Sequence, residues 1–205
     1  FCLTVPATVG LLFLAEPLIS LIFEHGRFDH LDTLKTAGAL RFYALGLFAY
    51  ASVKVMVPVF YALDDTKFPV IGSFLTVGVN VLVIQLVLGA LEHKAMALSI
   101  SCAMLINFLF LSTVLYRKIA GYSLGYLFGG LAKVALATGL MGGWLLLGSS
   151  WLSKWLTGGI LEQLAALLLL IGSSAAVYGL ALYLLRLREL AFLVEKVLGR
   201  FRGQE

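Results

Sequence analysis

The chain has 205 residues, of which 61% are hydrophobic and 13% charged, and its formal net charge is +4. Soluble domains carry roughly a quarter charged residues, about twice the fraction found in this chain. Together with a mean hydropathy of +1.00, the low charge content excludes a soluble domain and predicts a membrane protein. The two cysteines, Cys2 and Cys102, lie in apolar segments without metal-ligand spacing. We expect no enzymatic activity, metal site or nucleic-acid partner.

Long stretches without charge divide the chain into candidate membrane spans. No charged residue lies within 68–91, 95–116, 134–153 or 163–185, and two further apolar segments, 1–23 and 34–63, contain isolated charges. A bilayer core of about 30 Å is crossed by about 20 helical residues. The sequence therefore predicts an all-α polytopic membrane protein with six transmembrane helices and short connecting loops.

The first segment contains Glu16, followed by Pro17. Together with Pro6, this proline predicts a bent helix. The glutamate is either a proton or cation site or an interfacial carboxylate reached by water, and both interpretations stay open. Because the chain opens on apolar residues without a starting methionine, we expect the C-terminal part of a longer membrane protein.

The second segment carries a lysine at membrane depth, which costs roughly 3 kcal/mol on insertion scales. At helical spacing, Lys54 shares an arc of about 60° with aromatic and acidic side chains. These residues are Tyr43, Tyr50, Tyr61 and Asp65. This stripe either lines a cavity, or Lys54 extends its ammonium toward the interface.

A proline follows Lys54 by one turn. Pro58 predicts a kink, and bent helices line the pathway in transporters, although a static kink is the alternative. The turn formed by Asp64, Asp65 and Thr66, with Pro69 just beyond it, predicts a hinge between the second and third helices.

The third helix carries an amide near mid-membrane. Asn80 shares a face with Ser73 and Thr76, and it either joins helices for about 0.5–2 kcal/mol or ligates a monovalent cation. Candidate partners lie on the fourth helix. They are Ser99, Ser101 and Asn107.

Most of the 15 Lys and Arg residues fall on one side of this topology. The positive-inside rule then places the loops around 64–68 and 117–125, and the C-terminus, in the cytoplasm. Residues 186–205 alternate apolar residues with Arg and Lys, which predicts an amphipathic helix on the inner surface.

Several motifs occur in an order that resembles a known family. They are P-A-x-V-G-L at 6–11, L-I-F-E-H-G-R-F-D at 21–29, T-A-x-A-L at 36–40, Y-A-x-G-L at 43–47 and K-V-x-x-P-x-F-Y-A-L-x-D-T at 54–66. Together they resemble the MurJ (MviN) lipid II flippases of the multidrug/oligosaccharidyl-lipid/polysaccharide exporter superfamily. The last motif is the most specific of these.

The resemblance implies a fourteen-helix fold with two lobes, of which this chain would supply helices nine to fourteen. Residues 1–116 would form four helices of the second lobe. Residues 117–185 would form two extra helices beside a groove for the lipid tail, and 186–205 the cytoplasmic tail. An N-terminal lobe of the same chain would be the missing partner.

The resemblance also implies a function. The family moves the undecaprenyl-pyrophosphate-linked peptidoglycan precursor, lipid II, across the bacterial inner membrane by alternating access, with membrane lipids as surroundings and no cofactor. Lys54 best fits its cationic cavity. Coupling to a monovalent cation or protons stays open, although Ile84 stands where some members have an aspartate beside the amide that Asn80 matches.

Three other functions stay open. One is a flippase for polysaccharide lipids, and another is a drug/cation antiporter of the same superfamily. The two extra helices and the motif at 54–66 count against the antiporter. The third is a membrane scaffold without transport, in which the stripe around Lys54 would be unnecessary.

Overall fold

A computed structural model describes residues 2–24, 26–91, 94–119, 124–152, 155 and 159–185. Its helices are α1 (Thr4–Phe23), α2 (His30–Ala62), α3 (Lys67–Leu91), α4 (Lys94–Lys118), α5 (Leu124–Trp151) and α7 (Ile160–Leu184). All 6 are long and apolar enough to cross a membrane, which confirms the predicted fold class. The predicted amphipathic tail, 186–205, lies outside the described residues.

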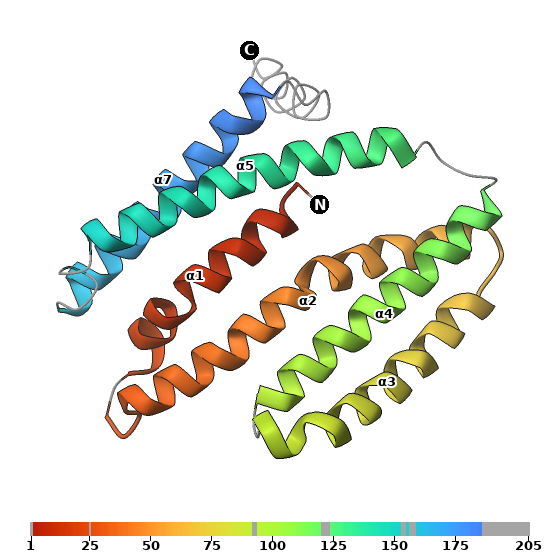
Figure 1. The fold of residues 1–205 in the computed structure, drawn as a ribbon, viewed down its shortest axis with the longest axis horizontal. Coiled ribbons are helices and arrows are strands. Elements are labelled where there is room, and N and C mark those ends of the chain that lie inside the picture. Colours follow the sequence, from red (N-terminus) through yellow and green to blue (C-terminus); the bar gives the residue numbers. More distant parts are fainter. Residues whose placement is uncertain are drawn as a thin grey trace, which may run out of the picture. The chain divides into compact units, whose positions relative to one another are not determined.

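The chain divides into two compact units, Phe1–Leu124 and Gly125–Glu205. In the first unit α2 packs between α1 and α4, and α4 packs between α2 and α3 (Figure 1). The consecutive helices α2 and α3 contact each other much less. Spatial order in this unit therefore differs from chain order.

The second helix begins earlier than the apolar pattern predicts. The Asp29 side chain caps its N-terminus by accepting a hydrogen bond from the backbone N–H of Asp32 at 2.9 Å. The acidic Asp32 lies in the first turn, where the helix dipole favours negative charge. Polar residues from His30 onward are therefore helical, although the apolar segment predicted for this helix begins only at residue 34.

Small residues allow α2 and α4 to approach closely. A Cβ added at Gly46 would lie 2.9 Å from the Cα of Ser101, so only glycine fits there. The Ser101 hydroxyl donates to the carbonyl of Phe42 at 2.6 Å. This contact joins two helices that are not consecutive in the chain.

An aromatic and aliphatic cluster joins the end of α2 to α3 and α4. Phe60, Leu111 and Leu115 are its buried members, and Phe68 packs against them. The Phe60 and Phe68 rings lie 6.1 Å apart, between centroids. The cluster holds three helices together beside the cavity described below.

The prolines differ in their effect. Pro17 and Pro58 lie inside α1 and α2, where a missing N–H leaves a carbonyl without its helical donor. Pro6 and Pro69 lie in the first turns of α1 and α3, where the N–H has no helical acceptor. Pro6 therefore breaks no helical hydrogen bond, and the bend of the first helix, predicted from Pro6 and Pro17 together, stays a prediction that rests on Pro17.

In the second unit, α5 and α7 pack against each other. The indole N–H of Trp144 donates to the Ser173 hydroxyl at 3.1 Å. A Cβ added at Gly148 would lie 2.6 Å from the Leu170 side chain, so these helices touch closely there. The opposite faces expose large apolar side chains such as Leu147 and Leu168, as expected beside lipid.

Candidate functional site

A cavity of about 420 Å³ opens between α2, α3 and α4. Its lining residues are Tyr50, Val53, Lys54, Val57, Pro58, Ser73, Thr76, Met104 and Asn107. Among the residues that the structure describes, Lys54 is the only charged side chain on this lining. The cavity thus combines apolar walls with a few polar groups, as small-molecule sites do.

The α2 wall supplies the positive charge. The Lys54 ammonium lies 5.1 Å from the centroid of the Tyr50 ring, which is cation–π distance. Pro58 has no N–H to donate to the Lys54 carbonyl one turn earlier. The Lys54 carbonyl therefore lacks its usual helical donor, close to the point where the Lys54 side chain enters the cavity.

The facing wall carries polar side chains from α3 and α4. Ser73 and Thr76 donate their hydroxyl protons to the carbonyls of Pro69 and Gly72, at 3.0 and 2.8 Å. Their oxygens keep lone pairs for other partners. Asn107 is 6% exposed, and its side-chain oxygen has no hydrogen-bond partner.

Only part of the aromatic stripe lies at the cavity. Tyr50 and Lys54 line it, whereas Tyr43 and Tyr61, which are exposed as Tyr50 is, do not. Asp65 lies beyond the end of α2, which closes at Ala62, so it does not continue the helical stripe. Its predicted place on that face is wrong because the chain turns at Leu63 and Asp64.

Asp65 instead forms an ion pair and hydrogen bond with Lys118 at the end of α4. The Lys118 hydrogen bond and charge hold the pKa of Asp65 below its usual range, and Lys67 acts in the same direction. The Lys118 ammonium also lies 5.7 Å from the Phe68 ring centroid. This pair fastens the α2–α3 turn to α4.

The hinge residues lie in that same turn. Asp64 has a positive φ of 53°, an uncommon conformation for a residue other than glycine. Thr66 directly precedes α3, and Pro69 is buried in the first turn of that helix. A hinge at Asp64, Thr66 and Pro69 stays a prediction, as does the one at Pro58.

The predicted cation residues have other partners. Ser99 and Ser101 donate to the carbonyls of Met96 and Phe42, at 2.9 and 2.6 Å. Within the described part of the chain, no hydrogen bond links Asn80 to either serine, and Ser73 and Thr76 line the cavity without Asn80. A monovalent-cation role for Asn80, Ser99 and Ser101 stays a prediction.

Glu16 pairs with an arginine of the neighbouring helix. Its carboxylate lies 3.5 Å from the Arg41 guanidinium, with the two side chains 41% and 45% exposed. The Arg41 Nε also donates to the Leu12 carbonyl at 3.2 Å. The pair therefore links α1 to α2 while both side chains remain accessible.

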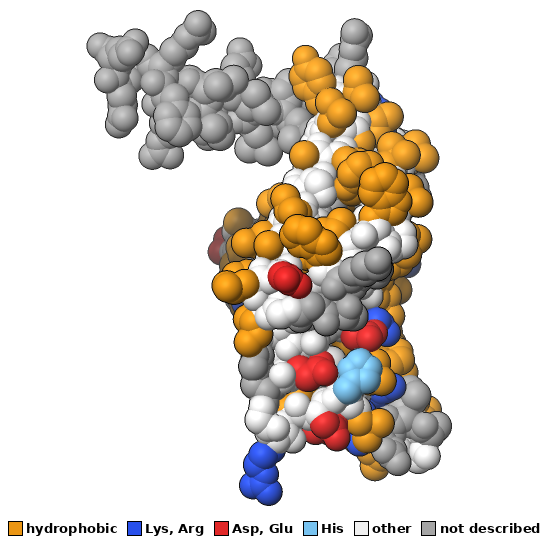
Figure 2. Space-filling view, turned by 90° about the vertical axis from the view of Figure 1, so that its left-hand side faces the viewer, with side chains coloured by type: hydrophobic (Ala, Val, Ile, Leu, Met, Phe, Trp, Pro, Cys, Tyr) orange, Lys and Arg blue, Asp and Glu red, His pale blue; other side chains and the backbone are white. Residues whose placement is uncertain are grey.

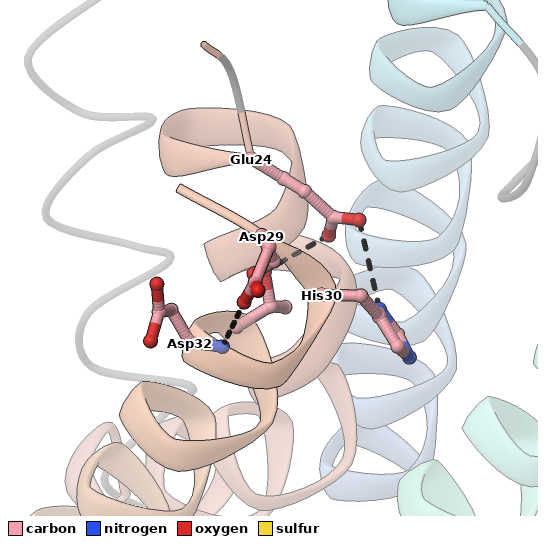
Figure 3. Close-up of polar contacts among 5 residues, drawn as sticks. Glu24, Asp29, His30 and Asp32 are labelled. Carbon is pink, nitrogen blue, oxygen red and sulfur yellow. Dashed lines mark hydrogen bonds and ion pairs between the residues drawn. The ribbon is translucent and has the colours of Figure 1, made fainter. Parts of the chain in front are cut away.

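A polar cluster forms the connection between α1 and α2 (Figure 3). Glu24 accepts a hydrogen bond from the Thr33 hydroxyl at 2.9 Å and lies 3.6 Å from His30. Hydrogen bonds from Ser20 and Thr33, together with the His30 charge, hold the pKa of Glu24 below its usual range. Acidic side chains and a histidine gather on one face in the space-filling view (Figure 2).

Comparison with known proteins identifies the family. The profile described as "Lipid II flippase MurJ" matches residues 1–166. The chain belongs to this family. A probable lipid II flippase MurJ of Buchnera aphidicola subsp. Schizaphis graminum is 30% identical over 192 residues, covering 93% of this chain and 37% of the relative.

Other MurJ proteins agree. The probable MurJ flippase of Buchnera aphidicola subsp. Acyrthosiphon pisum is 36% identical over 115 residues, or 56% of this chain and 22% of the relative. A solved structure of lipid II flippase MurJ in an inward closed conformation superposes with a TM-score of 0.71 at 25% identity. The match covers 92% of this chain and 37% of the solved MurJ chain. The chain thus spans between 22% and 37% of the length of these MurJ proteins.

Sequence reasoning missed two contacts of this MurJ-family chain. It grouped Ser73 and Thr76 with Asn80, whereas they share the cavity with Lys54 and Asn107. It also gave Asp65 no partner, although Lys118 pairs with it. Asn107 was visible as an amide in an uncharged span, but nothing in the sequence indicated which helix it faces.

Proposed function

We propose that this chain is part of a flippase that moves a lipid-linked peptidoglycan precursor, lipid II, across the bacterial inner membrane. The observation that carries the proposal is the MurJ family match over residues 1–166. The cavity between α2, α3 and α4 supports it, because a lysine at membrane depth is costly without a role.

In this proposal Lys54 attracts the pyrophosphate of the precursor. An ammonium in a partly apolar cavity interacts with an anion more strongly than it would in water. The bend at Pro58 and the turn at Asp64 to Thr66 allow the helices to tilt during alternating access. The groove for the lipid tail lies along α5 and α7, and membrane lipids contact their apolar faces.

The other half of the pathway comes from an N-terminal lobe of the same protein. We infer a cytoplasmic C-terminus from the charge distribution. Coupling to a monovalent cation or to protons belongs to the proposal as well, with Asn80 and Glu16 as the residues to examine. No cofactor is required.

The test is complementation of flippase-depleted bacteria by the full-length coding sequence that carries this chain. Lys54→Glu and Lys54→Ala are expected to lower transport by at least about tenfold, because each removes the positive charge proposed to attract the pyrophosphate. Protein levels are measured by immunoblotting and should be normal.

Lys35→Glu is the matched control, because Lys35 lies on the same helix, is exposed and does not line the cavity. It is expected to support growth. Full rescue by Lys54→Glu at normal protein level would overturn the role of Lys54. Failure of the wild-type coding sequence itself to rescue growth would favour a scaffold without transport.

A further inference from the structure

Asn107 is a buried polar residue of the cavity with incomplete hydrogen bonding. The residue is 6% exposed, and its Oδ1 has no partner. A buried carbonyl oxygen left unpaired costs about 1–3 kcal/mol. A hydrogen-bond donor that reaches this amide from the cavity in a working state of the protein would remove that free-energy cost.

The surroundings of Asn107 keep its amide in place. A Cβ added at Gly72 would lie 2.4 Å from Oδ1, so glycine on α3 provides the space that the amide occupies. Because the amide oxygen and nitrogen have nearly the same size, half a turn about the last torsion exchanges them within that space. Asn107 can thus present its oxygen to the cavity without moving a helix.

The neighbouring groups on this wall are also acceptors. The hydroxyl protons of Ser73 and Thr76 are donated to backbone carbonyls, which leaves their lone pairs. Facing them, Lys54 is the only cation on the described lining, with its ammonium over the Tyr50 ring. An ammonium has three donors, and the ring satisfies none of them as a hydrogen bond.

We propose that Asn107 positions the Lys54 ammonium inside the cavity. The ammonium is held between the Tyr50 ring and the Asn107 oxygen, so that it faces the cavity before an anionic headgroup arrives. Holding a charge in place beforehand strengthens binding, because less ordering is needed when the ligand binds. The contact is inferred from the lining that Lys54 and Asn107 share and from the unpaired Asn107 oxygen. Its effect on the substrate rests on the proposed function.

A double-mutant cycle in the full-length protein tests the contact. Lys54→Met and Asn107→Leu remove the two polar groups at nearly constant volume, and thermal unfolding in detergent is measured for each and for the double variant. We expect the double variant to lose clearly less stability than the sum of the single losses, as contacting residues do. Additive losses would overturn the proposal.

The second readout is the affinity of the same variants for lipid II. Asn107→Leu is expected to weaken binding at least about fivefold when Lys54 is present and less than about twofold in the Lys54→Met background. A purely structural role would weaken binding equally in both backgrounds. Unchanged affinity in Lys54→Met alone would overturn the substrate role of Lys54, while the unfolding cycle would still decide the contact.

Asn80→Leu is the matched control, since it removes an amide from α3 that does not line the cavity. Its effects should be the same in both Lys54 backgrounds. If Asn107→Leu does not accumulate, Asn107→Thr, which retains an acceptor, is measured in its place. Its losses of stability and of affinity for lipid II should again depend on the presence of Lys54. The same variants are also compared in sodium chloride and in choline chloride. If sodium chloride stabilises the protein more, and this effect requires Asn107 but not Lys54, the amide binds a cation and the proposal is overturned.

Discussion

At the scale of single residues, glycines determine how closely the helices of the first unit approach. Gly46 faces the backbone of Ser101, and Gly72 faces the amide of Asn107. The two sites differ in what an added methyl group meets. At Gly46 the nearest atoms include a Cα, which cannot move away as the end of a flexible side chain can.

Gly46→Ala is expected to destabilise the protein by about 1–3 kcal/mol, because the added Cβ overlaps the α4 backbone. Thermal unfolding in detergent measures the loss. Gly78→Ala is the control, since a Cβ there meets nothing within 4 Å. Equal stability of Gly46→Ala and Gly78→Ala would contradict the close α2–α4 contact.

At the scale of elements, the turn between α2 and α3 is held by its contact with α4. Asp65 pairs with Lys118, and the Lys118 ammonium also lies over the Phe68 ring. The neighbouring Asp64 has a positive φ, so the turn is tight and specific. This arrangement holds the end of α2 around Phe60 against α4, next to the cavity that Tyr50 to Pro58 line.

Asp65→Asn is expected to lower the unfolding temperature most near neutral pH. The pKa of Asp65 is lowered in the folded state, so its stabilising effect is present above the unfolded pKa and is lost as pH falls through the folded value. The difference between wild type and Asp65→Asn should therefore shrink below about pH 4. Unfolding temperatures measured across pH provide the test.

Asp64→Asn is the matched control for that experiment. The residue neighbours Asp65, is exposed, and has a conformation that asparagine adopts readily. Its unfolding temperature should follow wild type at each pH. A constant difference between wild type and Asp65→Asn down to acidic pH would show that the ion pair with Lys118 does not stabilise the fold.

At the scale of the whole molecule, α2 separates two polar ends of the first unit. The cluster around Glu24 and His30 lies where α2 begins, and the pair of Asp65 and Lys118 lies just beyond its end. With 33 residues, α2 is about 50 Å long, which exceeds a bilayer core of about 30 Å. The two ends therefore belong to opposite membrane surfaces.

A cysteine at Thr66 is expected to react with an impermeant thiol reagent only from the cytoplasm, and one at Asp29 only from outside, because the positive-inside rule orients the chain that way. Labelling of intact cells and of inverted vesicles measures this. Cys2 and Cys102 are first replaced by serine, and that background serves as the unlabelled control. The reversed pattern would overturn the orientation.

Part of the candidate site follows from sequence periodicity. Lys54 and Pro58 were predicted on one helix, and Tyr50 on the same face, because a helical arc depends only on spacing within the segment. The place of Asp65 could not be predicted in this way, since the helix ends before it. Its partner Lys118 is far away in the chain, and no local pattern indicates such a pair.

The sequence by itself determined the class of the protein, six apolar helices, and the motifs that resemble MurJ, because the bilayer requires long uncharged helices and the motifs are local. The tertiary structure decided which faces meet. Non-consecutive α2 and α4 pack together, and this packing brings Lys54 opposite Asn107, Ser73 and Thr76. Helix pairing depends on shape complementarity between distant segments, chiefly where glycines and serines allow backbones to approach, and spacing along one helix does not contain that information.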